Sequence, residues 1–396
     1  MPKISVLIPD AESTLTGHVL HCLSRDRDVE VHLLSKDPKS TVRRSRFVKS
    51  FNVYDSNIIG EVKPDPGQKV DEETRELIRF HYYDKQREDA LVSEILKHAS
   101  RIGNPVVFPV DEHIVKILSG CQDKIRPKAQ LAPLTSREMF TTAIDKWQLS
   151  QFLTKHGVPH PATTKLDKTL DQKSLSLLKF PVIAKPINLG NAQGIHSFDS
   201  LDALTGFFKN QDVQHEYIVQ PFIKGFDIDC SVICNNGEIL AYTIQRAIEH
   251  SKKKYAAAVG IEFLFHEKVL GVVTQMMKHL NWSGVAHIDL RYDEADDLVK
   301  VIEVNGRYWG SLLGSLVAGI NFPLLSLKIV KGEEFALPKY EFSRYFMGSA
   351  PMKRLLTSMF SSNRIHFRET SFSFSVRDPG PFLTEMSGKI GKKIFG

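Results

Sequence analysis

VIEVNGRYWGSL, residues 301–312, begins with the β-branched side chains that a sheet favours and then places polar groups at every second position. Side chains alternate between the two faces of a strand, so Glu303, Asn305 and Arg307 are expected on one face. A carboxylate, an amide and a guanidinium are costly to bury unless each has a partner. The stretch therefore predicts a strand that ends in a polar site.

A second strand offers such partners. Asp289 lies in GVAHIDLRY, and an acidic turn returns the chain into the strand of Glu303. If the two strands form a hairpin, Asp289, Glu303 and Asn305 face one point, and oxygen ligands of this kind suit magnesium rather than zinc. The alternative is a network of ion pairs that uses Arg291 and Arg307 in place of a cation.

Two lysines are candidates for binding the phosphates that often share the coordination of a magnesium ion. Lys185 ends the apolar strand FPVIAK, where an ammonium group is costly unless an anion accompanies it. Lys146 lies on a helix predicted over residues 137–157, with Ser136 as its N-cap. Without further context, a lysine on a helix surface indicates no function.

The length of the chain, 396 residues, is too great for one ordinary core and indicates two or three compact units. Its 42% hydrophobic and 25% charged residues are typical of a soluble globular protein. No apolar run reaches the length of a membrane span, and the first apolar run is too short for a signal peptide. We therefore expect a cytoplasmic protein without a membrane partner. The cysteines have no metal-binding spacing and are expected to be reduced core thiols: Cys22, Cys121, Cys230 and Cys234.

The formal net charge of +6 is concentrated in residues 339–396, where ten Lys or Arg residues outnumber four Asp or Glu residues. A nucleic-acid-binding surface would interleave aromatic side chains with a basic face. The Phe-rich stretch FRETSFSFSVRD, residues 367–378, instead alternates like a strand. We therefore expect a solvated basic extension and no nucleic-acid partner.

The order of predicted elements divides the chain in two. Residues 4–9 and 29–35 are predicted strands on either side of an amphipathic helix, which is the opening of a doubly wound parallel sheet. This unit is predicted to end near residue 125, before a proline-containing linker over 126–136. The later strands follow one another through turns such as Asn236-Gly237 and are expected to be antiparallel. The fold class is thus an α/β unit joined to an α+β unit.

From about residue 137 to 325 the chain resembles an ATP-grasp enzyme, because four motifs occur in the order of that family. DKWQLSQFLTKHGVPHPAT is similar to the first lysine motif and FPVIAKP to the second lysine strand. VQPFIKGFDIDCSV is similar to the hinge that holds adenine and ribose, and GVAHIDL with VIEVNGRYWGS to the metal strands. The resemblance implies a small subdomain at 137–222, a large subdomain with the metal site at 223–332, and a C-terminal extension at 333–396.

Residues 1–125 resemble the Rossmann-like domain that precedes this module in biotin carboxylases and carbamoyl-phosphate synthetases. STVRRSRFVKSF in particular is similar to predicted carboxylate–amine carboligases and D-aspartate ligases. The first strand is not followed by G-x-G-x-x-G, so a bound dinucleotide is not expected. We expect this domain to shape the acceptor pocket.

The resemblance also assigns roles to residues. It makes Lys146 and Lys185 phosphate ligands of ATP, and it makes Asp289, Glu303 and Asn305 ligands of two Mg²⁺ ions, with Mn²⁺ as an alternative. One departure from the family lies in its phosphate loop, which is normally rich in Gly and Ser, whereas NLGNAQGIHSF has two glycines.

The remaining assignments concern adenosine and the reacting groups. Gln220, the backbone at Phe222 and Ile223, and Asp227 would hold adenine and ribose. Two arginines are assigned catalytic roles: Arg307 would face the transferred phosphoryl group or the substrate carboxylate, and Arg246 would point into the site. An exposed cation at the sheet edge is the alternative for Arg246.

The implied reaction is the activation of a carboxylate by ATP as an acyl phosphate, followed by attack of an amine to give an amide, ADP and phosphate. One alternative is an enzyme that activates bicarbonate. Another is an ATP-binding regulatory protein without turnover, which the glycine-poor loop favours and the intact set of Asp289, Glu303 and Asn305 disfavours. The expected partners are a small carboxylate and a small amine, and the sequence leaves a homodimer open.

Overall fold

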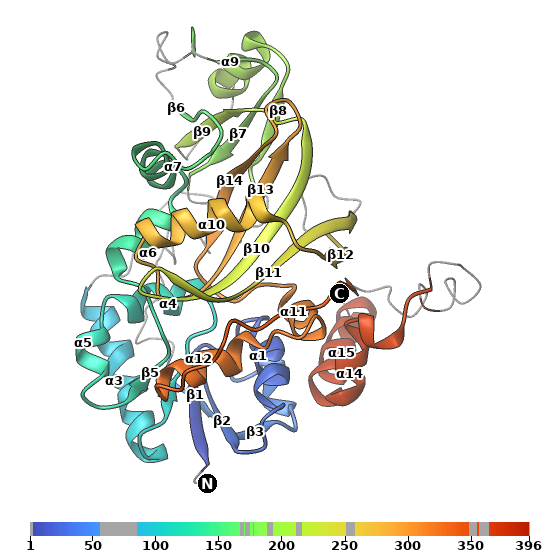
Figure 1. Ribbon diagram of the computed structural model, residues 1–396. Coiled ribbons are helices and arrows are strands. Elements are labelled where there is room, and N and C mark those ends of the chain that lie inside the picture. Colours follow the sequence, from blue (N-terminus) through green and yellow to red (C-terminus); the bar gives the residue numbers. More distant parts are fainter. Residues whose placement is uncertain are drawn as a thin grey trace.

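The computed structural model arranges the chain around three sheets (Figure 1). The large central sheet separates an N-terminal unit, at the bottom of the view, from a small four-stranded unit at the top. The structure describes residues 3–55, 85–166, 170, 175–176, 178–187, 193–210, 216–250, 258–347, 355 and 364–395. Residues 188–192 of the expected phosphate loop lie outside this described part.

The N-terminal unit is a five-stranded parallel sheet with the order β3-β2-β1-β4-β5, as the doubly wound pattern predicts. Its strands are β1 Ile4–Ile8, β2 Val29–Ser35, β3 Val48–Val53, β4 Val106–Val107 and β5 Gln130–Leu131. Its helical segments are α1 Thr16–Leu23, η1 Thr41–Arg44, α3 Lys85–Ile102, α4 Glu112–Ser119 and α5 Gln122–Ile125. β5 lies inside the stretch predicted as a linker, so the sheet extends past residue 125.

The strand order reverses between β1 and β4, and crevices for ligands form outside the carboxyl ends of strands at such a point. β4 is short because Pro109, which has no N–H to donate, follows one residue after the last ladder bond at Phe108. The chain after β4 therefore leaves the sheet early. It is held by buried Asp10, whose carboxylate accepts hydrogen bonds from the backbone N–H groups of Val110 and Asp111.

The small unit is an antiparallel sheet with the order β6-β9-β7-β8. Its elements are β6 Thr164–Leu166, β7 Val182–Pro186, β8 His196–Phe198, α9 Leu201–Asn210 and β9 Tyr217–Pro221. Val182, Ala184 and Val219 point into a separate apolar cluster, which leaves Lys185 on the opposite face of β7.

The helix predicted over 137–157 is two helices, α6 Arg137–Ile144 and α7 Lys146–Lys155. Ser136 caps the first helix as predicted, because its hydroxyl accepts from the N–H of Met139 at 3.2 Å. Asp145 leaves the helical conformation, with ψ of 114°, and its carboxylate accepts from the N–H of Gln148 as the N-cap of α7. The prediction of one helix was wrong because apolar spacing does not register a cap inside a helical pattern.

The large sheet has the order β14-β13-β10-β11-β12-β15, and all its pairings are antiparallel, as expected. Its strands are β10 Gly225–Asn235, β11 Glu238–Glu249, β12 Gly260–Phe263, β13 Gly284–Asp293, β14 Leu298–Asn305 and β15 Ser343–Phe346. Asn236 and Gly237 form the predicted hairpin turn, with φ of 48° and 83°.

Three helices pack on the large sheet, and the last two of them also pack on α1 of the N-terminal unit. They are α10 Glu267–His279, α11 Leu312–Val317 and α12 Phe322–Val330. Leu312 and Phe322 share one buried cluster with Val19 and Leu20 of α1, so the two units have a continuous core. All four cysteines are buried and free, as predicted.

The C-terminal region ends in η3 Phe367–Glu369, α14 Phe372–Arg377 and α15 Pro379–Phe395. The strand predicted over 367–378 was therefore wrong. A capping box between His366 and Glu369 starts the helical turns, and β15 is the strand that pairs with β12 in place of the Phe-rich stretch. Within the described residues, no helix is both long enough and apolar enough to cross a membrane.

Candidate ATP and metal site

The candidate site begins with three neighbouring strands of the large sheet. Asp289 on β13 lies opposite Glu303 on β14, so the predicted hairpin pairing is confirmed. On its other side Asp289 lies opposite Asp229 on β10. A register irregularity follows Asp289 in the pairing with β14. Three carboxylates therefore lie side by side across the sheet.

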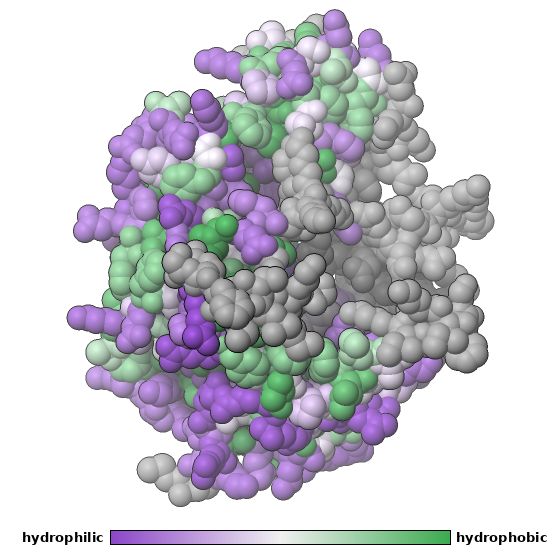
Figure 2. All heavy atoms as spheres, turned by 90° about the vertical axis from the view of Figure 1, so that its right-hand side faces the viewer, coloured by the Kyte–Doolittle hydropathy of each residue, from purple (hydrophilic) through white to green (hydrophobic). Residues whose placement is uncertain are grey.

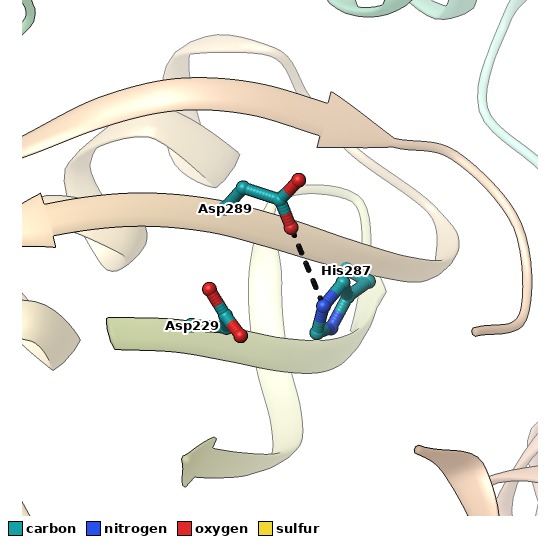
Figure 3. A group of neighbouring side chains, drawn as sticks. All are labelled: Asp229, His287 and Asp289. Carbon is teal, nitrogen blue, oxygen red and sulfur yellow. Dashed lines mark ion pairs between the residues drawn. The ribbon is translucent and has the colours of Figure 1, made fainter. Parts of the chain in front are cut away.

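His287, two residues before Asp289 on β13, belongs to the same face. Its Nε2 lies 3.4 Å from Asp289 Oδ1, and one ligand atom from each of Asp229, His287 and Asp289 falls within 4.8 Å of the others (Figure 3). Asn305 Nδ2 donates to the second oxygen of Asp289 at 3.4 Å. The donor set thus consists of carboxylate and amide oxygens with one imidazole nitrogen.

The protonation of these groups reflects their crowding. Desolvation raises the pKa of Asp289 well above its usual range, and the nearby carboxylates of Asp229 and Glu303 raise it further. Desolvation also raises the pKa of Asp229 to about 7. Burial, with Arg307 nearby, lowers the pKa of His287 to about 3, which keeps its imidazole neutral and able to donate a lone pair. A bound cation would favour the charged carboxylates, so this face has the chemistry of a metal site.

The two predicted lysines lie near the same carboxylates, Lys146 on α7 and Lys185 on β7 of the small unit. Lys146, the first residue of α7, lies 3.1 Å from Glu303 through its buried Nζ. Burial lowers the pKa of Lys185 on β7 to about 8, a shift that Glu303 opposes and Lys146 reinforces. Two ammonium groups near one carboxylate leave an excess of positive charge. A bound polyanion would stabilise this arrangement.

The predicted adenosine residues lie along the strand junction from β9 to β10. Gln220 is buried, and its Nε2 donates to Thr163 Oγ1 at 3.0 Å. The ring of Phe222 is 43% exposed and lies 5.6 Å from the guanidinium of Arg291. An aromatic face open to solvent can receive a nucleobase.

Arg291 on β13 binds this junction directly. Its Nε donates to the carbonyl of Ile223 at 2.8 Å, its Nη2 donates to the carbonyl of Gly225 at 2.8 Å, and its Nη1 pairs with Asp227. The expected alternative was a network in which Arg291 and Arg307 neutralise the metal carboxylates. Arg291 is instead engaged by the predicted adenosine hinge.

Arg307 lies at the boundary with the N-terminal unit. Its Nη2 donates to Asn305 Oδ1 at 3.4 Å, and its Nε lies 3.8 Å from Asp111 and 3.7 Å from Glu112. Burial raises the pKa of Glu112 to about 7, although Arg307 opposes this shift. The carboxyl end of β4, at the point where the strand order reverses, thus forms a wall of the site.

Arg246 lies apart from these groups. On β11 it pairs with Glu262 of β12, and its guanidinium is 5.7 Å from the ring of Phe226. Its described contacts connect it to neither the metal carboxylates nor the lysines, so its predicted role stays a prediction.

Sequence reasoning missed Asp229, His287, Gln245 and Glu112. Gln245 links two elements, since its Nε2 donates to Asp229 and its Oε1 accepts from Ser311. The alternation of Asp227 and Asp229 on one strand face was a usable signal for Asp229. No local pattern distinguishes Glu112 because its partner, Arg307, is far away in the sequence.

Comparisons with known proteins identify the module that holds this site. Residues 143–311 match the family model described as ATP-grasp domain. The carbamoyl phosphate synthase large chain of Agathobacter rectalis is 24% identical over 208 residues, which cover 50% of this chain and 20% of that protein. The D-alanine–D-alanine ligase of Hydrogenovibrio crunogenus is 24% identical over 217 residues, which cover 50% of this chain and 68% of the ligase.

A solved structure shows the same fold over a longer stretch. The biotin carboxylase domain of the 2-oxoglutarate carboxylase of Hydrogenobacter thermophilus, in complex with MgADP, ADP and bicarbonate, has a TM-score of 0.62 and 14% identity. The similarity covers 87% of this chain and 73% of that one. Residues 143–311, the stretch that contains every site residue expected from the sequence, thus match the ATP-grasp domain model, and the solved structure has a similar fold over most of the chain.

Proposed function

We propose that this chain is an ATP-dependent carboxylate–amine ligase that activates a carboxylate as an acyl phosphate and then forms an amide. The ATP-grasp match and the similarity to a D-alanine–D-alanine ligase support this class of reaction. The observation that carries the proposal is the contact of Lys146 with Glu303, because it brings a phosphate-binding candidate to a metal-binding one.

ATP would lie between the small and the large unit. Lys146 and Lys185 would bind its phosphates through their ammonium groups, and Asp227 would bind the ribose hydroxyls. Gln220 would contact the adenine with its amide, beside the exposed ring of Phe222 and the backbone at Ile223.

Asp289, Glu303 and Asn305 would hold Mg²⁺, and we propose two ions with Mn²⁺ as an alternative. The oxygen donors fit Mg²⁺, and the imidazole of His287 beside them suits a transition-metal ion such as Mn²⁺ better. When bound, the ions neutralise charge on the β- and γ-phosphates. The biotin carboxylase domain with a similar fold was crystallised with MgADP.

In the proposed reaction, an oxygen of the substrate carboxylate attacks the γ-phosphorus, and the bond to the β-phosphate oxygen breaks to release ADP. The nitrogen of the amine then attacks the acyl carbon, loses a proton, and phosphate leaves. Arg307 would bind the substrate carboxylate or the transferred phosphoryl group with its planar guanidinium. Catalysis of this kind rests on positioning and charge neutralisation and needs no covalent enzyme intermediate.

ADP release across a panel of amino acids, other small carboxylates, amines and bicarbonate tests the proposal. We expect release that requires both a carboxylate and an amine, and ¹⁸O from the labelled carboxylate should appear in inorganic phosphate. Release driven by bicarbonate alone would point to a carboxylase. Formation of AMP would contradict an acyl phosphate, and ATP binding without any turnover would contradict a ligase.

A further inference from the structure

The described surface on the side drawn in Figure 2 mixes hydrophobic and hydrophilic side chains, and this mixture favours no single kind of partner. The face of the large sheet toward the proposed ATP site is different. Asp229, His287 and Asp289 each offer one ligand atom there, and the three atoms lie within 4.8 Å of one another. We call these three residues the imidazole cluster. Neither Asp229 nor His287 belongs to the metal ligands expected from the sequence, so the cluster is a feature of its own.

The imidazole cluster has little positive charge near it. Asp229 accepts a hydrogen bond from Gln245 Nε2 at 3.1 Å, and among the described residues no Lys or Arg pairs with its carboxylate. Arg307 acts electrostatically on Asp289, but it also faces carboxylates of the N-terminal unit. Two neighbouring carboxylates that lack matching cations are costly to keep charged. A bound cation would therefore stabilise this face.

The imidazole of His287 is oriented by a hydroxyl behind it. Its Nδ1 forms a hydrogen bond of 2.9 Å with fully buried Ser231 Oγ, and its Nε2 lies 3.4 Å from Asp289 Oδ1. Nε2 has no hydrogen-bond partner among the described residues, although His287 is only 9% exposed. When Nδ1 donates to Ser231, Nε2 presents its lone pair to the cluster. A hydrogen bond on one ring nitrogen is the usual way in which a metal-binding histidine is directed.

The two carboxylates are also held from outside the cluster. Gln245 Nε2 donates to Asp229 Oδ2, and Gln245 Oε1 in turn accepts from buried Ser311 at 2.8 Å. Asn305 Nδ2 donates to Asp289 Oδ2 at 3.4 Å, which leaves Oδ1 to face the imidazole. Each of the three ligands thus has a hydrogen-bond partner behind it. Such outer partners fix the orientation of metal ligands before an ion binds.

The spacing of the cluster favours a metal ion over the ammonium group of a substrate. Ligand atoms about 2.1 Å from a divalent ion lie roughly 3.0 to 3.4 Å apart at octahedral or tetrahedral angles. The 3.4 Å between His287 Nε2 and Asp289 Oδ1 fits this range. Acceptors about 2.9 Å from an ammonium nitrogen would lie roughly 4.7 Å apart at tetrahedral angles. Among metal ions, an imidazole beside two carboxylates suits a transition metal better than magnesium.

We propose that Asp229, His287 and Asp289 bind a divalent transition-metal ion in the absence of nucleotide. Asp229 lies on the side of β13 that is away from Glu303, so the ion would lie beside the proposed nucleotide-bound ions and would not replace them. Asp289 would bridge the two kinds of site. Because protein groups alone form the imidazole cluster, binding of this ion does not depend on the proposed ligase activity.

Binding of Mn²⁺ to the full chain without nucleotide tests the proposal, with electron paramagnetic resonance to count free and bound ions. We expect one bound ion per chain, and pulsed measurements should show its coupling to an imidazole nitrogen. His287→Asn should abolish this coupling. Asp229→Asn should weaken Mn²⁺ binding at least ~10-fold, since the loss even of a group that supports a ligand costs about 10- to 100-fold. Gln245→Met should weaken it about 10-fold and serves as the second variant if Asp229→Asn fails to fold.

Matched controls separate the cluster from other acidic and imidazole groups. Asp202→Asn and His250→Asn change exposed residues of the same types and should bind Mn²⁺ as the unchanged protein does. Absence of bound Mn²⁺ without nucleotide, a bound ion without nitrogen coupling, or an equal loss of binding in the controls would overturn the proposal. ADP release is measured separately with Mg²⁺, so a failure of the ligase activity and a failure of this ion site are distinguished.

Discussion

At the scale of the residue, Glu303 is where the two halves of the proposed ATP site meet. It lies opposite Asp289 in the sheet and 3.1 Å from Lys146 of α7. A side chain in this position would serve the metal and the phosphates at once. Its loss would therefore affect turnover more than folding.

We expect Glu303→Ala to lower ATP turnover at least ~10²-fold, since the loss even of a residue that supports a metal ligand costs about 10- to 100-fold. The measurement is ADP release with the substrate pair found in the panel, together with circular dichroism to verify the fold. Glu294→Ala, in the exposed turn between β13 and β14, is the matched control. Near-normal turnover in folded Glu303→Ala would remove this residue from the metal site.

Lys185 offers a test that depends on pH. Because burial lowers its pKa to about 8, the free protein loses this positive charge as the pH rises through 8, whereas bound phosphates would hold the proton. Nucleotide binding near pH 8 should therefore take up protons, which titration calorimetry in buffers of different ionisation enthalpy measures.

The same experiment on Lys185→Met should show weaker binding and less proton uptake. Lys179→Met, at an exposed position just before β7, should behave like the unchanged protein. Unchanged affinity and proton uptake in Lys185→Met would mean that this lysine does not contact the phosphates.

Glu112 should make stability depend on pH. Its pKa is raised from 4.5 to about 7, so between these values the folded chain holds a proton that the unfolded chain has released. The stabilisation is complete below pH 4.5 and is lost as the pH rises through 7. Asp229 acts in the same direction, so only the difference between variants isolates Glu112.

The quantity to compare is the decrease in the free energy of unfolding between pH 5 and pH 8. We expect this decrease to be roughly 1 to 3 kcal/mol smaller in Glu112→Gln than in the unchanged protein. Denaturant titrations at several pH values measure this difference, and Glu294→Gln should leave it unchanged. Parallel curves for Glu112→Gln and the unchanged protein would show that Glu112 has an ordinary pKa.

At the scale of the element, the sequence predicted those features that depend on neighbouring residues. The face of Asp289 and Glu303 followed from the period of two in a strand, and the hairpin at Asn236-Gly237 followed from its turn residues. The stretch 367–378 misled because a short alternation of Phe and Ser fits either state, and neighbouring segments decide between them. The sequence could not predict that Glu112 belongs to the site, because only the packing of two units brings it to Arg307.

The break between α6 and α7 is an element with a function to test. Asp145 caps α7 and so fixes its first residue, Lys146. Asp145→Ala should lower the free energy of unfolding by about 1 kcal/mol. It should also raise the KM for ATP, because the cap would no longer fix the position of Lys146 at the start of α7.

Asp145→Asn retains a capping oxygen and should restore both quantities, measured by denaturant titration and steady-state kinetics. A KM for ATP that rises in Asp145→Ala and returns to its original value in Asp145→Asn would assign the effect to the cap. If Asp145→Ala changes stability alone, the helix break does not position Lys146.

At the scale of the whole molecule, the site draws on all three sheets. The small unit supplies Lys185, and helix α7 supplies Lys146. The large sheet supplies the carboxylates, and the N-terminal unit supplies the wall at Asp111 and Glu112. Substrate pockets are commonly built by loops that share no sequence motif, which is why the sequence predicts the reaction class and not the substrate.

β13 has a further consequence for the molecule. It is hydrogen-bonded on both sides, and on one face it carries Asp289 and, two residues later, Arg291, which holds the hinge. The two positions are about 6.8 Å apart along an extended strand, and the paired neighbours prevent any stretch. Under the proposed roles the strand fixes how far the adenosine hinge lies from the metal carboxylates, so a change in loop conformation would leave the distance between these two parts of the ATP site unchanged.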